Sequence, residues 1–575
     1  MALKPPQQYL DEIRARALRI FYRGQRFDNP VDHPVAAPAA RCVAETYAAA
    51  LEPDTGMAAR SPLTGEPVNV SNLLWRSRED LIARVKWERL IGRRTGRGAL
   101  RSPGLDAINA LAVVTHACDR ARGTGYHRRL RAFVERIGRD DLAVSGAMTD
   151  VRGDRSRRPG AQADPDLFLR VVDRDAEGVV LRGAKAHQTS AIHCHEHLVL
   201  PMTCSPGEEA WAIACAVPSD APGITHVYAR QPSDSRRAED APLDVGLPAF
   251  GGCESLMIFE DVRVPWQRVF LCGETEHTQE LVRLFGSFHR FCYGGCKVGI
   301  ADVVIGAASL IARANGVGDS RAIRDKLTEM VQLNETMYAC ALAAAVEGRP
   351  TDAGTFIPDI ALANVTKLNV TRAPFEIARL AADIAGGAML TLPSQADLEH
   401  AELGPLVAKY MTASPDVPAR ERMALFRLLE FLTHGSGAVY FLHESLHGAG
   451  APGGDAHPAP ARDPARSLRG RGARAAGGVT RRGDPQGWPR PRWTSYERCS
   501  ITCAGTRVVV HDHRAEAAAD GATGITRVVT LRPSCHGHPR ASPWPPRRAC
   551  TRPGCWRSSG AKTPSYRSVR RGVLR

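Results

Sequence analysis

Apolar and polar positions follow different spacings along the 575-residue chain, and the changes of spacing divide it into parts. Over residues 1–141, apolar residues recur every three to four positions, which predicts helices. Over 142–275, short apolar runs alternate with Gly, Asp and Pro, which is typical of strands joined by turns. Over 276–452 the helical spacing returns. We therefore expect an N-terminal helical domain, a middle antiparallel β domain of the barrel or sandwich type, and a C-terminal helical bundle.

The third part contains the longest helical stretches of the sequence. Short connections join them, which favours antiparallel neighbours in a bundle. We expect helices over 280–316, 320–347, 358–385, 402–413 and 416–433.

Residues 453–575 have a different composition, which is rich in Arg, Pro, Gly, Cys and Trp and shows no apolar periodicity. Such a composition buries too little apolar surface to offset the entropy of an ordered chain. We predict that this segment is a disordered tail or an out-of-frame translation of a GC-rich gene. The out-of-frame interpretation is favoured because the composition changes abruptly after a motif that ends at Pro452. A basic arm that binds nucleic acid is the alternative.

The net charge of +15 is concentrated in that C-terminal segment. From residue 453 on, 23 Arg and one Lys outweigh seven acidic residues, which gives +17 and leaves −2 for residues 1–452. A near-neutral body gives no reason to expect a nucleic-acid partner.

The sequence shows neither an export signal nor a membrane span. The first residues lack the apolar core of a signal peptide, and no uncharged apolar run reaches about 18 residues. The longest candidate, Val298 to Ala314, contains Asp302 and is predicted to be a buried helix. Ten of the 15 cysteines lie before residue 453 at irregular spacing, which favours reduced thiols. We expect a cytoplasmic protein with no membrane partner.

The stretch Ser287–Gly299 carries an unusually reactive set of side chains. If it is helical, His289, Tyr293, Cys296 and Lys297 lie on one stripe, because their offsets are i, i+4, i+7 and i+8. One face then presents an imidazole, a phenol, a thiol and an ammonium group. A core helix with incidental polar residues is the alternative, and composition alone supports it equally well.

Two glycines, Gly294 and Gly295, lie in the same stretch. Each costs about 1 kcal/mol in a helix interior relative to Ala. We therefore expect them to let another group approach the backbone closely.

A polar, turn-prone loop at 148–156, M-T-D-V-R-G-D-R-S, begins the β part. Its backbone N–H groups and Arg155 could hold a cofactor ring or a diphosphate. On spacing alone, a plain surface turn is favoured.

The segment 184–197, A-K-A-H-Q-T-S-A-I-H-C-H-E-H, combines histidines with small polar residues. His193, His195 and His197 alternate as on one face of a strand, which suggests a metal site. Structural strand histidines are favoured, because no second set of ligands is evident. Residues 188–190, Q-T-S, offer hydrogen-bonding groups of the kind that a flavin edge needs.

Three further positions can take part in chemistry. Glu254, at the start of a predicted strand, is a base or an ion-pair partner. Gly386 and Gly387 end a helix, where they either admit a phosphate or cap the helix. Glu444 and His447 are one helical turn apart before a glycine-rich turn, which suits acid–base work or a capped helix end.

Taken in order, these motifs resemble those of one flavoprotein family. M-T-D-x-x-G-D-R-S, G-A-K-A-H-Q-T, H-x3-Y-x2-C-K, A-G-G and E-S-x-H-G-A-G all occur within residues 1–452. The chain resembles the 4-hydroxybutyryl-CoA dehydratase/vinylacetyl-CoA Δ-isomerases, within the 4-hydroxyphenylacetate 3-hydroxylase flavoprotein family. The resemblance implies an α+β fold of the acyl-CoA dehydrogenase type, assembled as a homotetramer.

The resemblance also implies an FAD site. It assigns FAD binding to the loop at 148–156, to the segment 187–190 and to the turn at 383–387. The residues concerned are Met148, Thr149, Asp150, Gly153, Asp154, Arg155, Ser156, His187, Gln188, Thr189, Ser190, Asp383, Gly386 and Gly387.

Catalytic residues and a [4Fe–4S] cluster are implied in the same way. The catalytic set is His289, Tyr293, Lys297, Glu254, Glu444 and Arg89. His289 and Cys296 would ligate iron, and two further thiolates come from a C-x3-C loop in this family. Gly98 and Ser102 occupy those two positions here. Neither supplies a thiolate, so the sequence predicts an incomplete cluster site.

The implied function is that of an FAD-dependent lyase and isomerase acting on a short acyl-CoA. It dehydrates a 4-hydroxyacyl thioester to crotonyl-CoA, with flavin activating an otherwise unreactive β-hydrogen and iron taking the hydroxyl group. It also moves a double bond, which needs only positioned acid and base groups beside the flavin. The alternatives are an FADH2-dependent aromatic monooxygenase of the 4-hydroxyphenylacetate 3-hydroxylase type and an inactive degenerate homologue.

Overall fold

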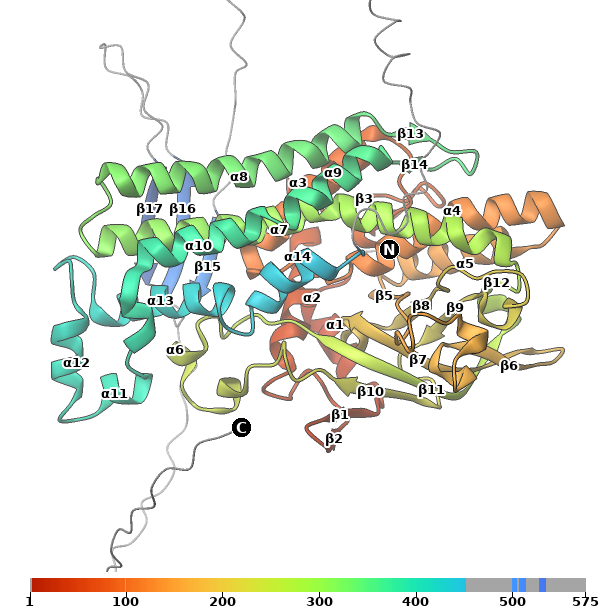
Figure 1. Ribbon diagram of the computed structural model, residues 1–575, viewed down its shortest axis with the longest axis horizontal. Helices are drawn as coiled ribbons and strands as arrows, with labels where there is room; N and C mark the ends of the chain where they lie inside the picture. Colours follow the sequence, from red (N-terminus) through yellow and green to blue (C-terminus); the bar gives the residue numbers. More distant parts are fainter. Residues whose placement is uncertain (1–2, 99, 451–498, 504–505, 513–526, 534–575) are drawn as a thin grey trace, which may run out of the picture. The chain divides into compact units, whose positions relative to one another are not determined.

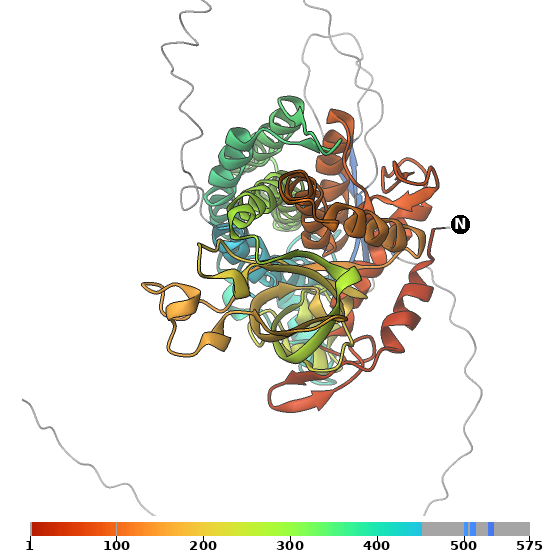
Figure 2. The same cartoon turned by 90° about the vertical axis from the view of Figure 1, so that its right-hand side faces the viewer.

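The computed structural model describes residues 3–98, 100–450, 499–503, 506–512 and 527–533. These residues belong to one compact unit. In both Figure 1 and Figure 2 the long green helices lie on one side of the yellow strands. The mixture of helix and sheet that the sequence predicts is confirmed, whereas the exact domain boundaries stay a prediction.

The N-terminal part is built mainly of helices, as expected. Their ends follow sequence signals: α3 begins with a capping box between Ser77 and Asp80 and ends at Gly96, which adopts a left-handed φ of 62°. The helices are α1 (Pro6–Arg14), α2 (Ala37–Leu51), α3 (Arg78–Thr95), α4 (Ser102–Arg122) and α5 (Tyr126–Arg139).

Four short strands also occur in this part, and the sequence analysis did not predict them. Each has three residues, too few to show a period of two. β1 joins the large sheet of the middle part by pairing with β10. The strands are β1 (Ile20–Tyr22), β2 (Gln25–Phe27), β3 (Ala58–Arg60) and β4 (Pro67–Asn69).

The middle part forms two sheets with strand orders β2-β1-β10-β11-β7-β6 and β12-β9-β8-β5. Most pairs are antiparallel, as predicted, but β1 with β10 and β5 with β8 are parallel. These two pairs join strands that are distant in the sequence, so no local turn signal marks them. The strands are β5 (Val144–Ala147), β6 (Arg170–Arg174), β7 (Gly178–Thr189), β8 (Glu196–Val199), β9 (Ile213–Pro218), β10 (Ile224–Tyr228), β11 (Glu254–Pro265) and β12 (Val269–Cys272).

The pairing of β7 with β11 places two residues of chemical interest opposite each other. In this antiparallel register Thr189, the last residue of β7, faces Glu254, the first residue of β11. The sheet therefore delivers a hydroxyl and a carboxyl group together at one end of the strands.

The C-terminal part is helical, with one difference from the expected pattern. The stretch predicted as a single helix over 358–385 forms two helices, separated at Thr371 and Arg372. Pro374 lies at the start of the second, where a proline is tolerated because its missing N–H needs no partner. The main helices are α7 (Thr278–Ala314), α8 (Arg321–Val346), α9 (Ile360–Val370), α10 (Ala373–Ala385), α12 (Gly404–Met411), α13 (Ala419–Thr433) and α14 (Glu444–His447).

Shorter helices and strands connect the main elements of the chain. A hairpin of β13 and β14 connects α8 to α9, and a π-helical turn over Val439–His443 leads into α14. The short elements are α6 (Pro242–Val245), α11 (Gln395–Glu399), β13 (Arg349–Pro350) and β14 (Phe356–Ile357).

Helix α7 is the central element of the structure. It packs against α3 and α4 of the N-terminal part and against α8, α9, α10 and α13 of its own part (Figure 1). Its length and apolar composition would suffice to cross a membrane, but 83% of its apolar window is buried inside the protein. The expectation of a buried helix from Val298 to Ala314 is confirmed.

Glycines bring α3 and α7 into backbone contact. A Cβ atom on Gly295 would lie 2.6 Å from Cβ of Glu88 and 2.7 Å from the carbonyl oxygen of Val85. A Cβ on Gly294, on another side of α7, would lie 2.2 Å from Cβ of Ala341 in α8. The expected close approach to the backbone is confirmed, and the approaching groups are neighbouring helices.

We predict that Gly295→Ala lowers the free energy of unfolding by about 1–3 kcal/mol, the usual range for overpacking a tight contact. Gly387→Ala is the matched control, because no atom of the described part lies within 4 Å of the added methyl group. Thermal unfolding of both variants measures the difference. Equal melting temperatures for the two variants would contradict the close packing of α3 on α7.

Three strands lie within the segment predicted as a tail. β15 (Cys499–Cys503), β16 (Thr506–Asp512) and β17 (Arg527–Pro533) form an antiparallel sheet in the order β15-β16-β17. The rest of 453–575 lies outside the described residues. The assignment of that segment as disordered or out of frame stays a prediction.

Candidate active site

A small cavity lies beside the middle of α7, with room for about two water molecules. Three parts of the chain contribute its walls: the loop between α3 and α4, the end of β7, and α7 with α14. The lining residues are Arg97, Gly98, Leu100, Ser102, Pro103, Thr189, His289, Cys292, Tyr293, Cys296, Lys297 and Glu444. The stripe predicted on Ser287–Gly299 is helical and faces this cavity.

Lys297 and Glu444 form an ion pair on one wall. Nζ of Lys297 donates to Oε2 of Glu444 at 2.7 Å and to the backbone oxygen of Tyr440 at 2.6 Å. The Tyr293 hydroxyl donates to the other carboxylate oxygen of Glu444 at 3.3 Å. Burial favours the neutral form of Glu444, but the Lys297 charge outweighs it and lowers the pKa of this carboxyl group. Glu444 is therefore ionised at neutral pH.

His289 is held in place by a buried carboxylate. Its Nδ1 lies 2.7 Å from Oδ2 of Asp106 in α4. The other oxygen of Asp106 lies 2.6 Å from Nη1 of Arg84, and the side chains of Arg84 and Asp106 are fully buried. When Nδ1 carries the proton of this hydrogen bond, Nε2 is the nitrogen that can accept a proton.

Two thiols follow His289 on the same face of α7. Cys296 lies opposite Gly98: a Cβ on Gly98 would be 3.5 Å from Sγ of Cys296. Cys292, one turn after His289, donates to the His289 carbonyl oxygen at 3.2 Å. Ser102 lines the same cavity, and its hydroxyl donates to Oε1 of Glu88 at 2.5 Å.

Glu254 is a second carboxyl group close to Glu444. The Thr189 hydroxyl donates to its Oε1 at 2.8 Å. Removal from water, and then the negative charge of Glu444, raise the pKa of Glu254 to about 8. Two neighbouring carboxyl groups thus differ in protonation at neutral pH, with Glu254 neutral and Glu444 charged, which is the arrangement of an acid beside a charged partner.

This pKa predicts a pH dependence of stability. Because the pKa of Glu254 is raised from 4.5 to about 8, the folded chain keeps a proton that the unfolded chain has lost between these values. The free energy of unfolding therefore falls as pH rises through this window. We expect the melting temperature of Glu254→Gln to fall less than that of the wild type between pH about 5 and 7. An equal fall in melting temperature for the variant and the wild type would contradict the raised pKa of Glu254.

Sequence reasoning missed several residues of this neighbourhood. Cys292 had a local signal, since its offset of i+3 from His289 places it on the same stripe. Asp106 and Lys367 come from other helices and had no local signal. Lys367 donates to the Ser445 carbonyl oxygen at 2.6 Å, and burial, followed by the Lys297 charge, lowers the pKa of Lys367 to about 7.

The structure brings together two of the three segments assigned to FAD. The buried carboxylate of Asp150 pairs with Nζ of Lys185 at 2.8 Å. The backbone N–H of Ala186 and the Gln188 side chain both donate to the Thr149 carbonyl oxygen, at 2.8 and 3.2 Å. The start of the loop at 148–156 therefore lies against residues 185–190.

The outer half of that loop is open to solvent. Asp154 accepts hydrogen bonds from the backbone and hydroxyl groups of Ser156 at 2.9 and 2.7 Å, and Gly153 and Arg155 are exposed beside it. Met148 is buried. Two further predicted residues of the adjoining segment, His187 and Ser190, adopt left-handed φ angles of 57° and 63°.

Two predicted groups lie apart from the cavity lining. Arg89 on α3 pairs with Asp302 at 2.7 Å and with Glu335 at 2.5 Å. Asp383 is exposed and pairs with Lys326 at 2.7 Å. Gly386 follows the last residue of α10 with a φ of 71° and a ψ of −167°, a conformation open to glycine but different from the usual left-handed helix cap, and Gly387 follows it. Roles of these residues in catalysis or FAD binding stay predictions.

His193, His195 and His197 are buried, and each has its own surroundings. His195 lies between the backbone N–H of Ala143 and Oε2 of Glu12, and His197 contacts the Ser145 hydroxyl at 2.7 Å. Burial lowers the pKa of His193 to about 3. Their different surroundings agree with the structural role that the sequence favoured.

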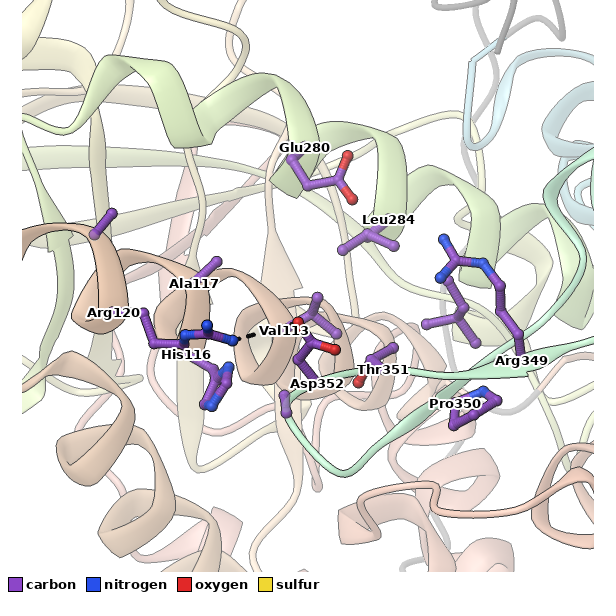
Figure 3. A pocket seen from close by; sticks show the side chains of 13 residues that line it. Val113, His116, Ala117, Arg120, Glu280, Leu284, Arg349, Pro350, Thr351 and Asp352 are labelled. Carbon is purple, nitrogen blue, oxygen red and sulfur yellow. Dashed lines mark hydrogen bonds and ion pairs between the residues drawn. The ribbon is translucent and has the colours of Figure 1, made fainter. Parts of the chain in front are cut away.

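A larger pocket of about 610 Å³ opens between α4, the start of α7 and the β13–β14 hairpin (Figure 3). Arg120 and Asp352 face each other across it at 3.4 Å, with His116, Glu280 and Arg349 nearby. None of its lining residues belongs to the predicted catalytic set. Size alone therefore does not identify the active site in this chain.

Comparison with known proteins gives matches over most of residues 6–456. Two family models, "4-hydroxyphenylacetate 3-hydroxylase N terminal" and "4-hydroxyphenylacetate 3-hydroxylase C terminal", match residues 6–271 and 278–456. The 4-hydroxybutyryl-CoA dehydratase/vinylacetyl-CoA Δ-isomerase of Clostridium aminobutyricum is 43% identical over 462 residues, covering 78% of this chain and 94% of that protein. The oxygenase component of 4-hydroxyphenylacetate 3-monooxygenase from Thermus thermophilus is 28% identical, covering 76% of this chain and 90% of its own.

Solved structures give the same two groups of relatives. An oxygen-tolerant archaeal 4-hydroxybutyryl-CoA dehydratase from N. maritimus superposes with a TM-score of 0.80 and 40% identity, covering 84% of this chain and 98% of its own. The oxygenase component of a 4-hydroxyphenylacetate 3-monooxygenase, complexed with FAD and 4-hydroxyphenylacetate, superposes with a TM-score of 0.69 and 26% identity, covering 78% and 93%.

Proposed function

Because the chain belongs to the 4-hydroxyphenylacetate 3-hydroxylase flavoprotein family, we propose that it is an FAD-dependent enzyme of the 4-hydroxybutyryl-CoA dehydratase/vinylacetyl-CoA Δ-isomerase type. Its substrate would be a short acyl-CoA. The observation that carries the proposal is the arrangement of His289, Lys297 and Glu444 on one cavity, with Glu254 paired to Thr189 at its edge. These groups can take a proton from one carbon and return one to another.

Moving a double bond from the β,γ to the α,β position requires loss of an α-proton and gain of a proton at the γ-carbon. His289 is the base in this proposal, since Asp106 holds Nδ1 and leaves Nε2 to accept the α-proton. Glu254 is the acid, because it remains protonated up to a pH of about 8. A proton is moved and no electrons are gained or lost overall.

Lys297 places a positive charge on the wall of the cavity. Loss of an α-proton builds negative charge on the thioester oxygen, and a fixed cation in a site without bulk water stabilises that charge strongly. Glu444 and the Tyr440 carbonyl oxygen hold the ammonium group in place from two sides. Tyr293 fixes the other oxygen of Glu444.

The residues at 148–156 and 187–190 fit the FAD role proposed for them. They meet where the Gln188 side chain donates to the Thr149 carbonyl oxygen, and Thr189 of the second segment reaches the cavity. Bound FAD would supply reversible electron transfer to the acyl group. The exposed backbone and Arg155 of the loop would bind its phosphates.

The [4Fe–4S] cluster implied by the resemblance does not fit the residues present. Position 98 faces Cys296 closely enough to carry a ligand, but glycine has no donor atom. At position 102 a serine replaces the expected thiolate, and its hydroxyl is engaged by Glu88. We therefore assign no step of the reaction to such a cluster, and propose double-bond migration as the principal activity.

Finer features complete the proposal. Val365, Leu368 and Phe375 leave 38–44% of their surface exposed on neighbouring helices α9 and α10, which supports a contact between copies of the chain and hence the homotetramer implied by the resemblance. We further propose an acyl-CoA dehydrogenase-like domain layout and a cytoplasmic location.

Flavin content and substrate class test this function together. The purified chain is expected to bind FAD and to convert vinylacetyl-CoA to crotonyl-CoA. An aromatic monooxygenase would instead hydroxylate 4-hydroxyphenylacetate when given reduced FAD and oxygen. Binding of FAD with phenol hydroxylation and no acyl-CoA turnover would overturn the proposal, and so would the lack of bound FAD that a degenerate homologue would show.

A further inference from the structure

The face of α7 beside the cavity carries more metal-binding side chains than the proposed reaction uses. One ring nitrogen of His289, Sγ of Cys292 and one oxygen of Asp106 all lie within 4.8 Å of one another. Asp106 and Cys292 are buried, and the His289 side chain is 13% exposed. A nitrogen, a sulfur and an oxygen donor thus converge in a space closed to bulk water.

A second thiol, Cys296, lies one turn beyond Cys292 and outside this group of three donors. His289, Cys292 and Cys296 have offsets of i, i+3 and i+7, so they follow one stripe of α7. Gly98 packs closely against Cys296, since a Cβ atom on Gly98 would lie 3.1 Å from Cβ of Cys296.

We propose that His289, Cys292 and Asp106 form a site for a single divalent metal ion of the Zn²⁺ type, with a solvent molecule as its fourth ligand. One imidazole, one thiolate and one carboxylate are ligand types that Zn²⁺ prefers, and three protein ligands with one solvent ligand complete a tetrahedral zinc site. This site differs from the four-iron cluster implied by the resemblance, since two of its ligands, Cys292 and Asp106, stand in for the donors that positions 98 and 102 lack.

Arg84 fixes the orientation of the Asp106 carboxylate. Arg84 holds Oδ1 of Asp106 at 2.6 Å, so Oδ2 remains directed to His289 at 2.7 Å. A metal ion would replace the proton shared by Oδ2 and Nδ1. Two ligands at about 2.0–2.1 Å in a tetrahedral site lie about 3.3 Å apart, so the two groups would separate by about 0.6 Å.

Metal binding and the proposed acid–base role exclude each other at His289. The ion would take the electron pair of the imidazole and would deprotonate the Cys292 thiol, releasing its proton to solvent. The metal-bound chain is then without its base. The inference concerns the metal and stands or falls separately from the acyl-CoA activity.

Titration of the full-length, chelator-treated and reduced chain with Co²⁺ tests the site. Tetrahedral Co²⁺ bound by thiolates has intense visible bands and a sulfur-to-cobalt charge-transfer band in the near ultraviolet. We expect one Co²⁺ per chain with these bands, and displacement by one equivalent of Zn²⁺. Absence of the sulfur-to-cobalt charge-transfer band in the wild-type chain would overturn the proposal, whatever the variants show.

Variants identify the ligands. Cys292→Ser is expected to weaken Co²⁺ binding at least tenfold and to reduce the charge-transfer band, and Asp106→Asn to weaken binding about 10–100-fold with the band retained. Cys340→Ser, on α8, is the control and should bind as the wild type does. Retained FAD content and circular dichroism show that each variant is folded.

Unchanged affinity in both Cys292→Ser and Asp106→Asn would overturn the assignment. So would about four iron atoms with four inorganic sulfides per chain after anaerobic purification, because that content requires a cluster in place of one ion.

Discussion

Replacing Arg84 by Met is expected to lower the free energy of unfolding by about 3–5 kcal/mol, the usual cost of leaving one partner of a buried ion pair alone. Arg84 and Asp106 are both fully buried, with 2.6 Å between Nη1 and Oδ1. The guanidinium also lies 3.6 Å from the buried Glu88 carboxylate and 4.5 Å from the centre of the Trp75 ring. Loss of Arg84 therefore leaves negative charge without its compensating cation in a part of the core that supports the active site.

Urea unfolding of the wild type, Arg84→Met and Arg84→Met/Asp106→Asn measures this effect. We expect the second substitution to recover part of the loss, since it removes the uncompensated charge and keeps a group that can bond to His289. Arg263→Met is the control, because the side chains of Arg263 and Asp175 are 48% and 45% exposed, and exposed pairs contribute at most about 1 kcal/mol. Equal losses in Arg84→Met and Arg263→Met would contradict the buried pair.

Replacing His289 by Asn is expected to lower the rate of double-bond migration by about 10²–10⁴-fold, the range that general base catalysis contributes. Asparagine can still bond to Asp106 but cannot accept the α-proton at neutral pH. FAD should remain bound, because the segments proposed to hold it, 148–156 and 187–190, do not include His289. The measurement is the initial rate of crotonyl-CoA formation per bound flavin.

His116→Gln is the matched control for the His289 variant. His116 lines the larger pocket between α4 and the β13–β14 hairpin (Figure 3), so its replacement should leave the rate within about twofold of the wild type. A greater loss of rate in His116→Gln than in His289→Asn would indicate that the active site lies in that pocket instead.

Local periodicity predicted the order of elements well, because it depends on neighbours in the sequence. The helical stripe from His289 to Lys297 and the strand start at Glu254 are both found as predicted. The resemblance added the expectation of a common site, and the structure places His289, Tyr293, Cys296, Lys297 and Glu444 on one cavity.

Contacts between distant segments could not be predicted in this way. Asp106 is 183 residues from His289 in the sequence, and no local pattern indicates that their helices meet. The parallel pairing of β5 with β8 depends equally on packing at long range. The role of Gly295 could be predicted only in part. Its small size predicted that another group approaches the backbone closely, but only the structure shows that this group is α3.

The central claim is that one cavity beside α7 holds the base and the acid that move a double bond in an acyl-CoA. Isomerisation in D2O tests it most directly, with the FAD-loaded chain, vinylacetyl-CoA and mass spectrometry of the product. We expect crotonyl-CoA that carries deuterium at the γ-carbon, delivered by an acid that exchanges with solvent. Failure of the FAD-loaded chain to form crotonyl-CoA would contradict the claim.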